Sequence, residues 1–209
     1  MNTDKSQKIM IALIEDNRFI RSGIEFILSK EPDFKLAGSY QSCEEAFYYD
    51  DIGYADIVLM DIKLPGISGI EGVRYLKKHF PEMVIIICTA YEDDENVFNA
   101  IAAGAVGFVA KKASPAVLLK TLRNVARGGS PMTPNVARNI ISSFEEQTSK
   151  QIKNRSELTE KEIKVLEKIS VGKSYTTVAR ELSATEEDVL FQIRIIYGKL
   201  QRCLVQLTN

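Results

Sequence analysis

The sequence predicts two folded parts, an α/β domain with a parallel sheet and, after it, an all-α domain. Between residues 9 and 128, a short apolar run followed by an amphipathic helical pattern recurs five times. Strands that alternate with helices in this way form a parallel, doubly wound sheet. After Gly128-Gly129-Ser130-Pro131 only helical patterns continue. The 209 residues suffice for two small domains with separate cores.

Five apolar runs are expected as strands, because each is short and most are rich in β-branched residues, as buried parallel strands are. They cover residues 9–14, 34–38, 57–60, 84–88 and 107–110. Asn17 is placed to cap the first helix. Ser42 is placed to cap the second helix, with Glu45 at the capping-box position three residues later. The remaining helices are expected over 69–80, 94–103 and from Ser114-Pro115 to residue 128.

Helical patterns fill the rest of the chain. One helix is expected from Pro134 to about residue 146, followed by a polar linker over 147–157. Four helices should then begin near Thr159, Ser174, Thr185 and Arg202. The expected organisation is a domain over 1–128, a linker with one helix over 129–156 and a four-helix domain over 157–209.

Composition is that of a soluble globular protein, with 45% apolar and 26% charged residues. No apolar run is long enough to span a membrane, and the polar start is not that of a signal peptide. Cys43, Cys88 and Cys203 are widely spaced, which favours a cytoplasmic location. Residues 129–209 hold 12 Lys and Arg against 10 Asp and Glu, so the second part is only weakly basic.

Polar side chains follow four of the expected strands. Glu15 and Asp16 follow the first, Asp61 the third, Thr89 the fourth and Lys111 the fifth. Each residue alone fits a turn or a solvated charge. Because parallel strands end at one edge of a sheet, however, these five side chains should meet there.

Three carboxylates at one edge require a cation between them. Oxygen ligands without His or Cys point to Mg²⁺ or Mn²⁺. The Lys111 ammonium and the Thr89 hydroxyl suit phosphoryl oxygens, and phosphoryl transfer depends mainly on positioning and charge neutralisation. Asp61 is then the expected acceptor, forming an aspartyl-phosphate.

With these residues, the first domain resembles the flavodoxin-like receiver domain of two-component response regulators. The matching segments are Glu15-Asp16, Asp-Ile-Val-Leu-Met-Asp-Ile-Lys-Leu-Pro-Gly ending at Gly66, Thr89-Ala90 and Phe108-Val109-Ala110-Lys111. The resemblance makes Asp61 the phosphoacceptor. It assigns the metal to Asp16, Asp61 and the Lys63 backbone carbonyl, with Glu15 helping through water.

The resemblance also implies a two-state switch. Thr89 and Lys111 contact the phosphoryl group, and the aromatic Phe108 turns inward as Thr89 moves; a plain core Phe is an equally good reading. Lys63 and Tyr91 occupy positions that tune phosphoryl lifetime. The implied donor is a sensor histidine kinase, and the phosphorylated protein is expected to dimerise. Such a protein is not a conventional enzyme, since it catalyses only its own phosphorylation and dephosphorylation.

The second domain resembles the LuxR/NarL-type helix-turn-helix domain. The resemblance is carried by the stretches 158–166, 172–174, 178–182 and 196–200. It implies DNA binding through phosphate contacts. The candidate cations are Lys161, Lys164, Lys173, Arg194, Lys199 and Arg202.

The recognition helix departs from the family pattern. Glu187 and Asp188 stand near its start, where such helices face phosphate. Leu190 and Phe191 occupy positions that are usually polar, and we expect them to be exposed. The pair could instead be a protein contact or an extension of the core. Acids at a helix start also favour the helix dipole, so ordinary capping explains them equally well.

Three functions remain open from the sequence. The first is a response regulator that controls transcription through its C-terminal domain. The second is a response regulator whose degenerate helix-turn-helix domain binds proteins or dimerises. The third is an enzyme of the same topology, a flavoprotein or a phosphatase. It is disfavoured because no phosphate-binding loop follows the first strand and Lys63 stands where a second acid would be needed.

Overall fold

The computed structural model describes residues 8–90, 94–150 and 158–207. Tertiary contacts divide the chain into two compact units. The first contains residues 1–91 and 109–122, and the second contains residues 92–108 and 123–209. Tyr91 falls outside the described residues, as does the stretch 151–157 of the expected linker.

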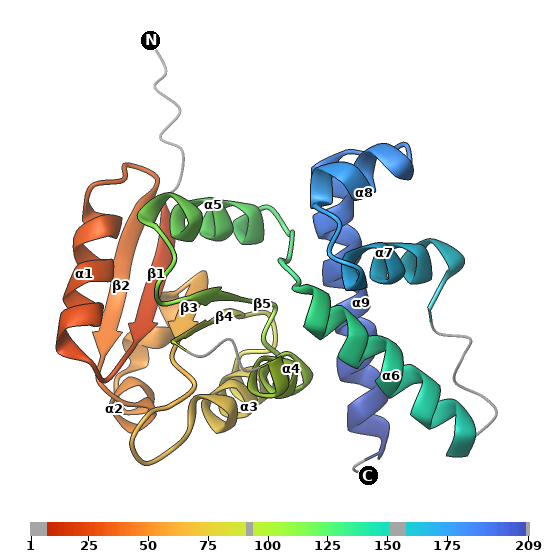
Figure 1. The fold of residues 1–209 in the computed structure, drawn as a ribbon. Coiled ribbons are helices and arrows are strands. Elements are labelled where there is room, and N and C mark those ends of the chain that lie inside the picture. The colour runs from red at the N-terminus through yellow and green to blue at the C-terminus, as the bar shows by residue number, and fades with distance from the viewer. Residues whose placement is uncertain (1–7, 91–93, 151–157, 208–209) are drawn as a thin grey trace. The chain divides into compact units, whose positions relative to one another are not determined.

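A five-stranded parallel sheet organises the N-terminal part of the chain, in the order β2-β1-β3-β4-β5 (Figure 1). The strands are β1 Ile9–Ile14, β2 Phe34–Tyr40, β3 Ile57–Met60, β4 Val84–Thr89 and β5 Gly107–Ala110. This confirms the predicted fold class, with β2 and β4 running slightly further than the sequence indicates. In β3 every side chain is buried, because helices cover both faces of the sheet.

Helices connect the strands, with α1 and α5 on one face of the sheet and α2 and α3 on the other (Figure 1). Their bounds are α1 Arg18–Ser29, α2 Cys43–Tyr48, α3 Gly69–His79 and α5 Pro115–Ala126, and a 3₁₀ helix, η1 Asp50–Tyr54, precedes β3. Asn17 caps α1 as predicted, since its side chain accepts hydrogen bonds from the Phe19 and Ile20 N–H groups. These connections place the loops after β1, β2 and β3 at the carboxyl edge of the sheet.

The second unit is mainly helical. Its helices are α4 Asp94–Ala103, α6 Pro134–Lys150, α7 Glu160–Ser170, α8 Tyr175–Glu181 and α9 Glu186–Leu207. Helix α9 packs against α7 and α8, and α6 packs against α7. The centre is apolar: Val165, Ile193 and Leu200 are fully buried. Tyr197 is also fully buried, with its hydroxyl donating to the Pro131 carbonyl at 2.8 Å.

The C-terminal helices differ from the prediction in one respect. The fourth helix expected near Arg202 is not separate, because α9 continues without a break through Leu207. Neither Gly nor Pro interrupts the chain between Lys199 and Leu207, so nothing there terminates the helix. Helix α6 also runs to Lys150, past its predicted end. In the part of the chain that the structure describes, no helix meets the length and hydropathy of a membrane span.

Candidate phosphoacceptor site

The acidic residues that follow β1 and β3 lie side by side because the two strands are paired. Ile14 is in register with Met60, and the Asp61 N–H donates to the Ile14 carbonyl at 2.9 Å. Glu15, Asp16 and Asp61 therefore have carboxylate oxygens that all lie within 4.8 Å of one another. Glu15 and Asp61 are buried, whereas Asp16 is exposed. The cluster thus opens to solvent on the side of Asp16.

Lys111 completes the cluster from β5. Its backbone N–H donates to the Thr89 carbonyl at 2.8 Å, which ties the ends of β4 and β5 together. Its ammonium donates to Asp61 Oδ2 and to Glu15 Oε1, each at 2.8 Å. Thr89 is buried at the end of β4. The five residues predicted from strand ends are therefore brought to one edge of the sheet.

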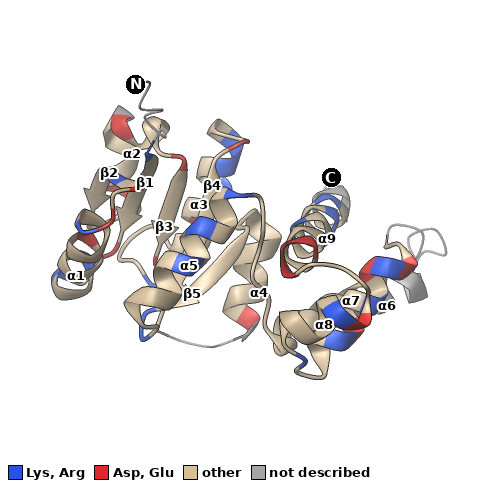
Figure 2. Cartoon of the chain, turned by 90° about the horizontal axis from the view of Figure 1, so that it is seen from above, with Lys and Arg blue, Asp and Glu red and all other residues tan. Residues whose placement is uncertain are grey.

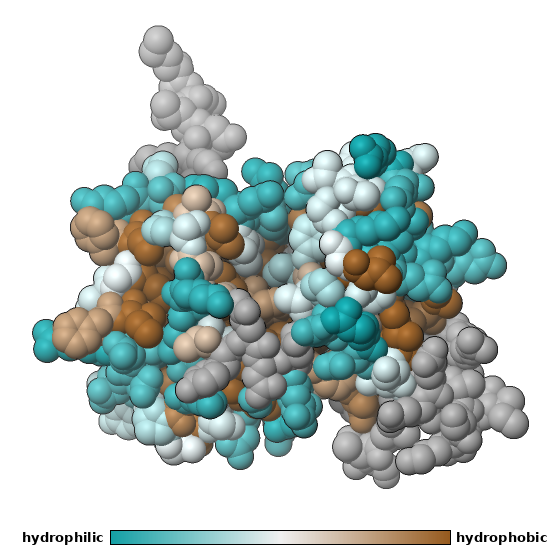
Figure 3. All heavy atoms as spheres, viewed as in Figure 1, coloured by the Kyte–Doolittle hydropathy of each residue, from teal (hydrophilic) through white to brown (hydrophobic). Residues whose placement is uncertain are grey.

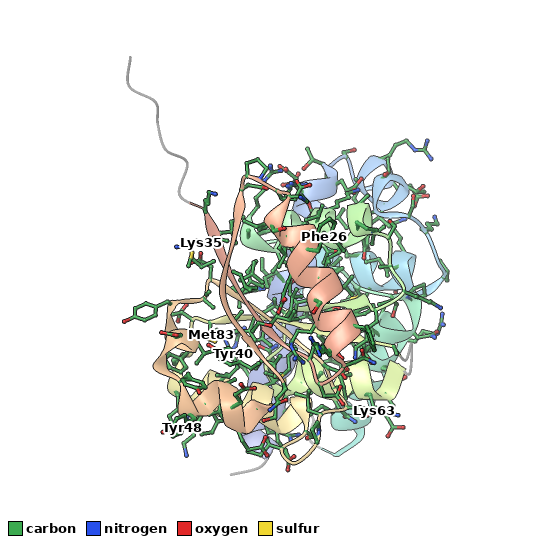
Figure 4. The ribbon with its side chains drawn as sticks, turned by 90° about the vertical axis from the view of Figure 1, so that its left-hand side faces the viewer. Phe26, Lys35, Tyr40, Tyr48, Lys63 and Met83 are labelled. Atoms are coloured by element: carbon green, nitrogen blue, oxygen red, sulfur yellow. The ribbon has the colours of Figure 1, made fainter. Side chains whose placement is uncertain are left out.

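The other residues named for this site lie around it. Lys63 is exposed in the loop after β3, and its side chain lies at the surface (Figure 4). Phe108 is half-buried in β5.

Burial and pairing shift the protonation of this cluster in defined directions. Burial raises the pKa of Glu15, although the hydrogen bond from Lys111 opposes the shift. Burial alone would lower the pKa of Lys111, but its hydrogen bonds to Asp61 and Glu15 outweigh this and raise it. Lys111 is therefore a permanent cation between two carboxylates at neutral pH.

The cluster has the composition of a site for a hard divalent cation. Its donors are carboxylate oxygens, with no His or Cys among them. Glu15 Oε2 is buried and lacks a hydrogen-bond donor, although Lys111 Nζ lies 2.6 Å from it as an ion pair. One ammonium thus faces three carboxylates, and a divalent ion would relieve the remaining repulsion. Glu15, Asp16 and Asp61 fit such an ion.

Glycine at position 69 allows α3 to begin directly against Asp61. A Cβ built on Gly69 would lie 1.9 Å from the Asp61 carbonyl oxygen, far inside van der Waals contact. Ser68 and Glu71 form a capping box that fixes the start of α3. Residues 61–68 are consequently a short loop fixed at both ends.

Two residues near the site were not indicated by the sequence. Arg21, on α1, donates from Nη1 to the carbonyl oxygens of Glu15 at 2.6 Å and Asp16 at 3.4 Å. Glu44, on α2, accepts a hydrogen bond from the Ile67 N–H at 2.8 Å. Both act on backbone groups, which residue type alone does not reveal.

The cations proposed for DNA binding are not equivalent in the structure. Lys161, Lys164 and Arg202 are exposed. Lys173 pairs with Glu181 at 2.6 Å, and Lys199 pairs with Glu162 at 2.8 Å.

Arg194 differs from the other candidate cations because it is partly inside the unit. Its side chain is half-buried, and its Nη1 is buried without a hydrogen-bond partner. Burial lowers the pKa of its guanidinium. Within the described residues, therefore, the six cations do not form one exposed basic surface.

The start of α9 carries three acids, seen as red residues in Figure 2. Asp188 accepts from the Thr185 N–H at 2.9 Å, and the Asp188 N–H donates to the Thr185 hydroxyl at 3.1 Å. Glu187 lies 3.6 Å from Arg127, and both side chains are exposed. Asp188 is thus part of a reciprocal cap, as the capping interpretation requires.

The expectation that Leu190 and Phe191 are both exposed is wrong for Leu190, which fits the alternative of a core extension. Leu190 is 4% exposed, whereas Phe191 is 52% exposed. A Cβ on Gly129 would lie 3.0 Å from Leu190 Cβ, and the Ser130 N–H donates to the Leu190 carbonyl at 3.0 Å. The segment after α5 therefore covers Leu190.

Comparison with known proteins agrees with this architecture. The family model described as "Response regulator receiver domain" matches residues 11–123. An uncharacterized transcriptional regulatory protein YxjL of Bacillus subtilis (strain 168) is 30% identical over 99% of this chain and 93% of its own. The transcriptional regulatory protein UhpA of Escherichia coli (strain K12) is 31% identical over 87% of this chain and 86% of its own.

Solved structures show the same fold. A two-component response regulator of the LuxR family from Aurantimonas sp. SI85-9A1 matches with 28% identity and a TM-score of 0.58, covering 68% of this chain and 99% of that one. The response regulator RcsB of Salmonella typhimurium matches with 21% identity and a TM-score of 0.56, covering 97% of this chain and 98% of that one. The chain therefore belongs to the response regulator receiver family, and it is a LuxR-type response regulator with a receiver domain followed by a helical C-terminal part.

Proposed function

We propose that this response regulator accepts a phosphoryl group on Asp61 from a sensor histidine kinase. The observation that supports this most is the ion-paired cluster in which Lys111 bridges Asp61 and Glu15. An Asp61 carboxylate oxygen attacks the phosphorus, and the bond from phosphorus to the donor imidazole nitrogen breaks. Lys111 and the hydroxyl of Thr89 are proposed to contact the phosphoryl oxygens, and the burial of Thr89 at the end of β4 supports this.

A divalent metal, Mg²⁺ or Mn²⁺, supplies charge neutralisation when it is bound. Glu15, Asp16, Asp61 and the Lys63 backbone carbonyl are the residues that would hold it. Lys63 and Tyr91 are proposed to tune the lifetime of the phosphoryl group. Phe108 is proposed to turn inward with Thr89, and the phosphorylated protein to dimerise.

The test of the phosphoacceptor is labelling by a small phosphodonor with Mg²⁺. Asp61→Asn should abolish the label, because the amide is a poor nucleophile. The matched control is Asp56→Asn, since Asp56 precedes the same strand at its other end and accepts a hydrogen bond from the Met10 N–H at 2.8 Å. Undiminished labelling of Asp61→Asn would contradict the assignment.

An apolar surface beside the site supports the choice of a protein donor. Phe19 is 87% exposed and Phe26 is 63% exposed, and both lie on α1, which begins just after Asp16. Apolar atoms are visible at the surface over this helix in Figure 3. Residues seven positions apart share one helix face, so this face suits a partner helix.

Replacing Phe19 and Phe26 by Ala should lower phosphoryl transfer from the kinase at least tenfold, because each ring would lose its apolar contact with the kinase. Labelling by the small phosphodonor should be unchanged, because both rings are exposed and neither residue belongs to the cluster. An equal loss with both donors would argue against a kinase surface here.

We further propose that the receiver spans residues 1–128, the linker 129–156 and the output domain 157–209. The output domain is proposed to bind DNA through exposed cations such as Lys161 and Lys164. The acidic start of α9 and the exposed Phe191 favour a second candidate, an output that binds a protein. A DNA selection on the full chain with and without phosphodonor tests this, since enrichment of a sequence motif supports DNA binding and no enrichment in either state supports the alternative.

A further inference from the structure

The loop after Asp61 is held by a carboxylate from another element. Glu44 Oε1 accepts the Ile67 N–H at 2.8 Å. Gly66, the residue before Ile67, has a left-handed φ of 73°, and a Cβ built on it would lie 2.1 Å from the same Glu44 oxygen. Glu44 therefore lies directly over the backbone of this turn, and the glycine leaves room for it.

The position of Glu44 follows from the local fold of α2. The Ser42 side chain caps α2 by accepting from the Glu45 N–H at 3.2 Å, which places Glu44 in the first turn. Helix α2 follows β2, so its start lies at the carboxyl edge of the sheet. The hydrogen bond from Ile67 lowers the pKa of Glu44, so the side chain is ionised at neutral pH.

Glu44 is also close to the acidic cluster. Together with Asp16, Pro65 and Gly66 it lines an open hollow of about 390 Å³. The turn from Asp61 to Ile67 contains Lys63, whose carbonyl is a proposed metal ligand. Hydrogen bonds fix both ends of this segment, from the Asp61 N–H to the Ile14 carbonyl and from the Gly69 N–H to the Ile62 carbonyl. Glu44 accepts a hydrogen bond from Ile67, between these two ends.

We propose that Glu44 is a positioning residue for the metal site, fixing the turn that presents the Lys63 carbonyl. This inference rests on the proposed function of Asp61 and its metal. Glu44 acts through the backbone of Gly66 and Ile67 rather than by touching the ion. Removing its hydrogen bond lets the turn relax and moves the carbonyl away from its position.

Three variants separate the hydrogen bond from the charge. Glu44→Ala removes both, whereas Glu44→Gln keeps an oxygen that accepts the Ile67 N–H. Glu45→Ala is the matched control, because Glu45 is the next carboxylate on α2 and accepts from the Gln41 N–H at 2.7 Å rather than from the turn.

The first measurement is the thermal midpoint of the full chain as a function of Mg²⁺ concentration. The Mg²⁺ concentration that gives half of the full rise in thermal midpoint should be on the order of tenfold higher in Glu44→Ala, as for other residues that orient metal ligands. It should stay within about twofold in Glu44→Gln and Glu45→Ala. Without Mg²⁺ the two Glu44 variants should have the thermal midpoint of the natural protein, since Glu44 and its hydrogen bond are exposed. Glu45→Ala loses a hydrogen bond at the start of α2, so any drop in its midpoint should be the same with and without Mg²⁺.

The second measurement is amide hydrogen exchange of Ile67 without metal. Exchange should be faster in Glu44→Ala and unchanged in Glu44→Gln. The proposal would be overturned if Glu44→Ala had the Mg²⁺ dependence and the Ile67 exchange rate of the natural protein. It would also be overturned if Glu44→Gln bound Mg²⁺ as weakly as Glu44→Ala. Labelling by the small phosphodonor tests the phosphoacceptor separately. If the natural protein is not labelled at any Mg²⁺ concentration, the assignment of Asp61 fails, while the exchange of Ile67 still reports on Glu44.

Discussion

At the scale of single residues, Gly69 shows how closely the loop after Asp61 is packed. Ala at this position would place a Cβ 1.9 Å from the Asp61 carbonyl oxygen, and that atom is backbone, so it cannot rotate away. The start of α3 or the end of β3 would have to shift. Asp61 would move with it, because its carbonyl and its carboxylate share one Cα.

We therefore expect Gly69→Ala to lower the free energy of unfolding by about 2 kcal/mol. It should also slow labelling of Asp61. The control is Gly23→Ala on α1, where a Cβ meets nothing within 4 Å. That variant should be about 0.5 to 1 kcal/mol more stable, since Ala favours helix. Urea unfolding followed by circular dichroism measures both, and equal stability of the two variants would contradict the close packing at Gly69.

Glu181 provides a pH-dependent test in the second unit. Hydrogen bonds from Lys168 and Lys173 lower its pKa from 4.5 to about 2. A carboxylate with a lowered folded-state pKa stabilises the fold above its unfolded pKa and loses that contribution as the pH falls toward the folded value. The contribution should therefore be complete above pH 4.5 and absent near pH 2.

Glu181→Gln should accordingly melt below the natural protein at pH 7, and the difference should shrink between pH 4.5 and pH 2. The effect should be small and clearest at low salt, because the site is exposed. Glu167→Gln, on the exposed face of α7, is the control. Scanning calorimetry across this pH range measures the midpoints, and a difference that persists at pH 2 would count against the ion pairs.

At the scale of elements, α9 shows why an unusual recognition helix still folds. Its acids are accounted for locally, since Asp188 caps the helix with Thr185 and Glu187 lies beside Arg127. Leu190 and Phe191 are neighbours in sequence but differ in burial, at 4% and 52% exposed. Leu190 meets Gly129, whereas Phe191 remains half exposed.

Leu190→Ala should therefore cost about 3 kcal/mol of unfolding free energy, the usual result of leaving a cavity at a buried leucine. Phe191→Ala should cost less than about 1 kcal/mol, because the side chain is already half exposed in the folded protein. Chemical denaturation of the two single variants decides the matter. Similar losses in both would mean that the two side chains are equally buried.

The sequence predicts the elements better than it predicts their contacts. Apolar runs identify β1 and β3 correctly, and the polar residues after them identify the cluster of Glu15, Asp16 and Asp61, because strand direction alone determines that meeting point. Arg21 and Glu44 were missed because they bind backbone carbonyl and N–H groups, which carry no sequence signal. The burial of Leu190 was missed because its partner, Gly129, is distant in the chain.

At the scale of the whole molecule, charge limits how the protein can bind DNA. The chain has a net charge of −1, and residues 155–209 hold nine Lys and Arg against eight Asp and Glu. Lys173 and Lys199 are engaged in ion pairs with Glu181 and Glu162. Among the described residues of the output domain, Lys161, Lys164, Arg180 and Arg202 are exposed, so counterion release must come mainly from these cations.

The dependence of DNA affinity on salt tests this division of the cations. Each phosphate contact contributes about 0.9 to the slope of log K against log salt concentration. Replacing Lys161 and Lys164 by Gln should thus lower the slope by about 1.8 per subunit while leaving the fold intact. Lys199→Gln should instead lower thermal stability, because Glu162 is 3% exposed and would lose its cation. Binding isotherms at four salt concentrations give the slopes. An unchanged slope in the Lys161 and Lys164 variant would show that these residues do not contact phosphate. Of the exposed cations, Arg180 and Arg202 would then remain as candidates for phosphate contacts, and the loss of α7 as a DNA-binding helix would favour the protein-binding function.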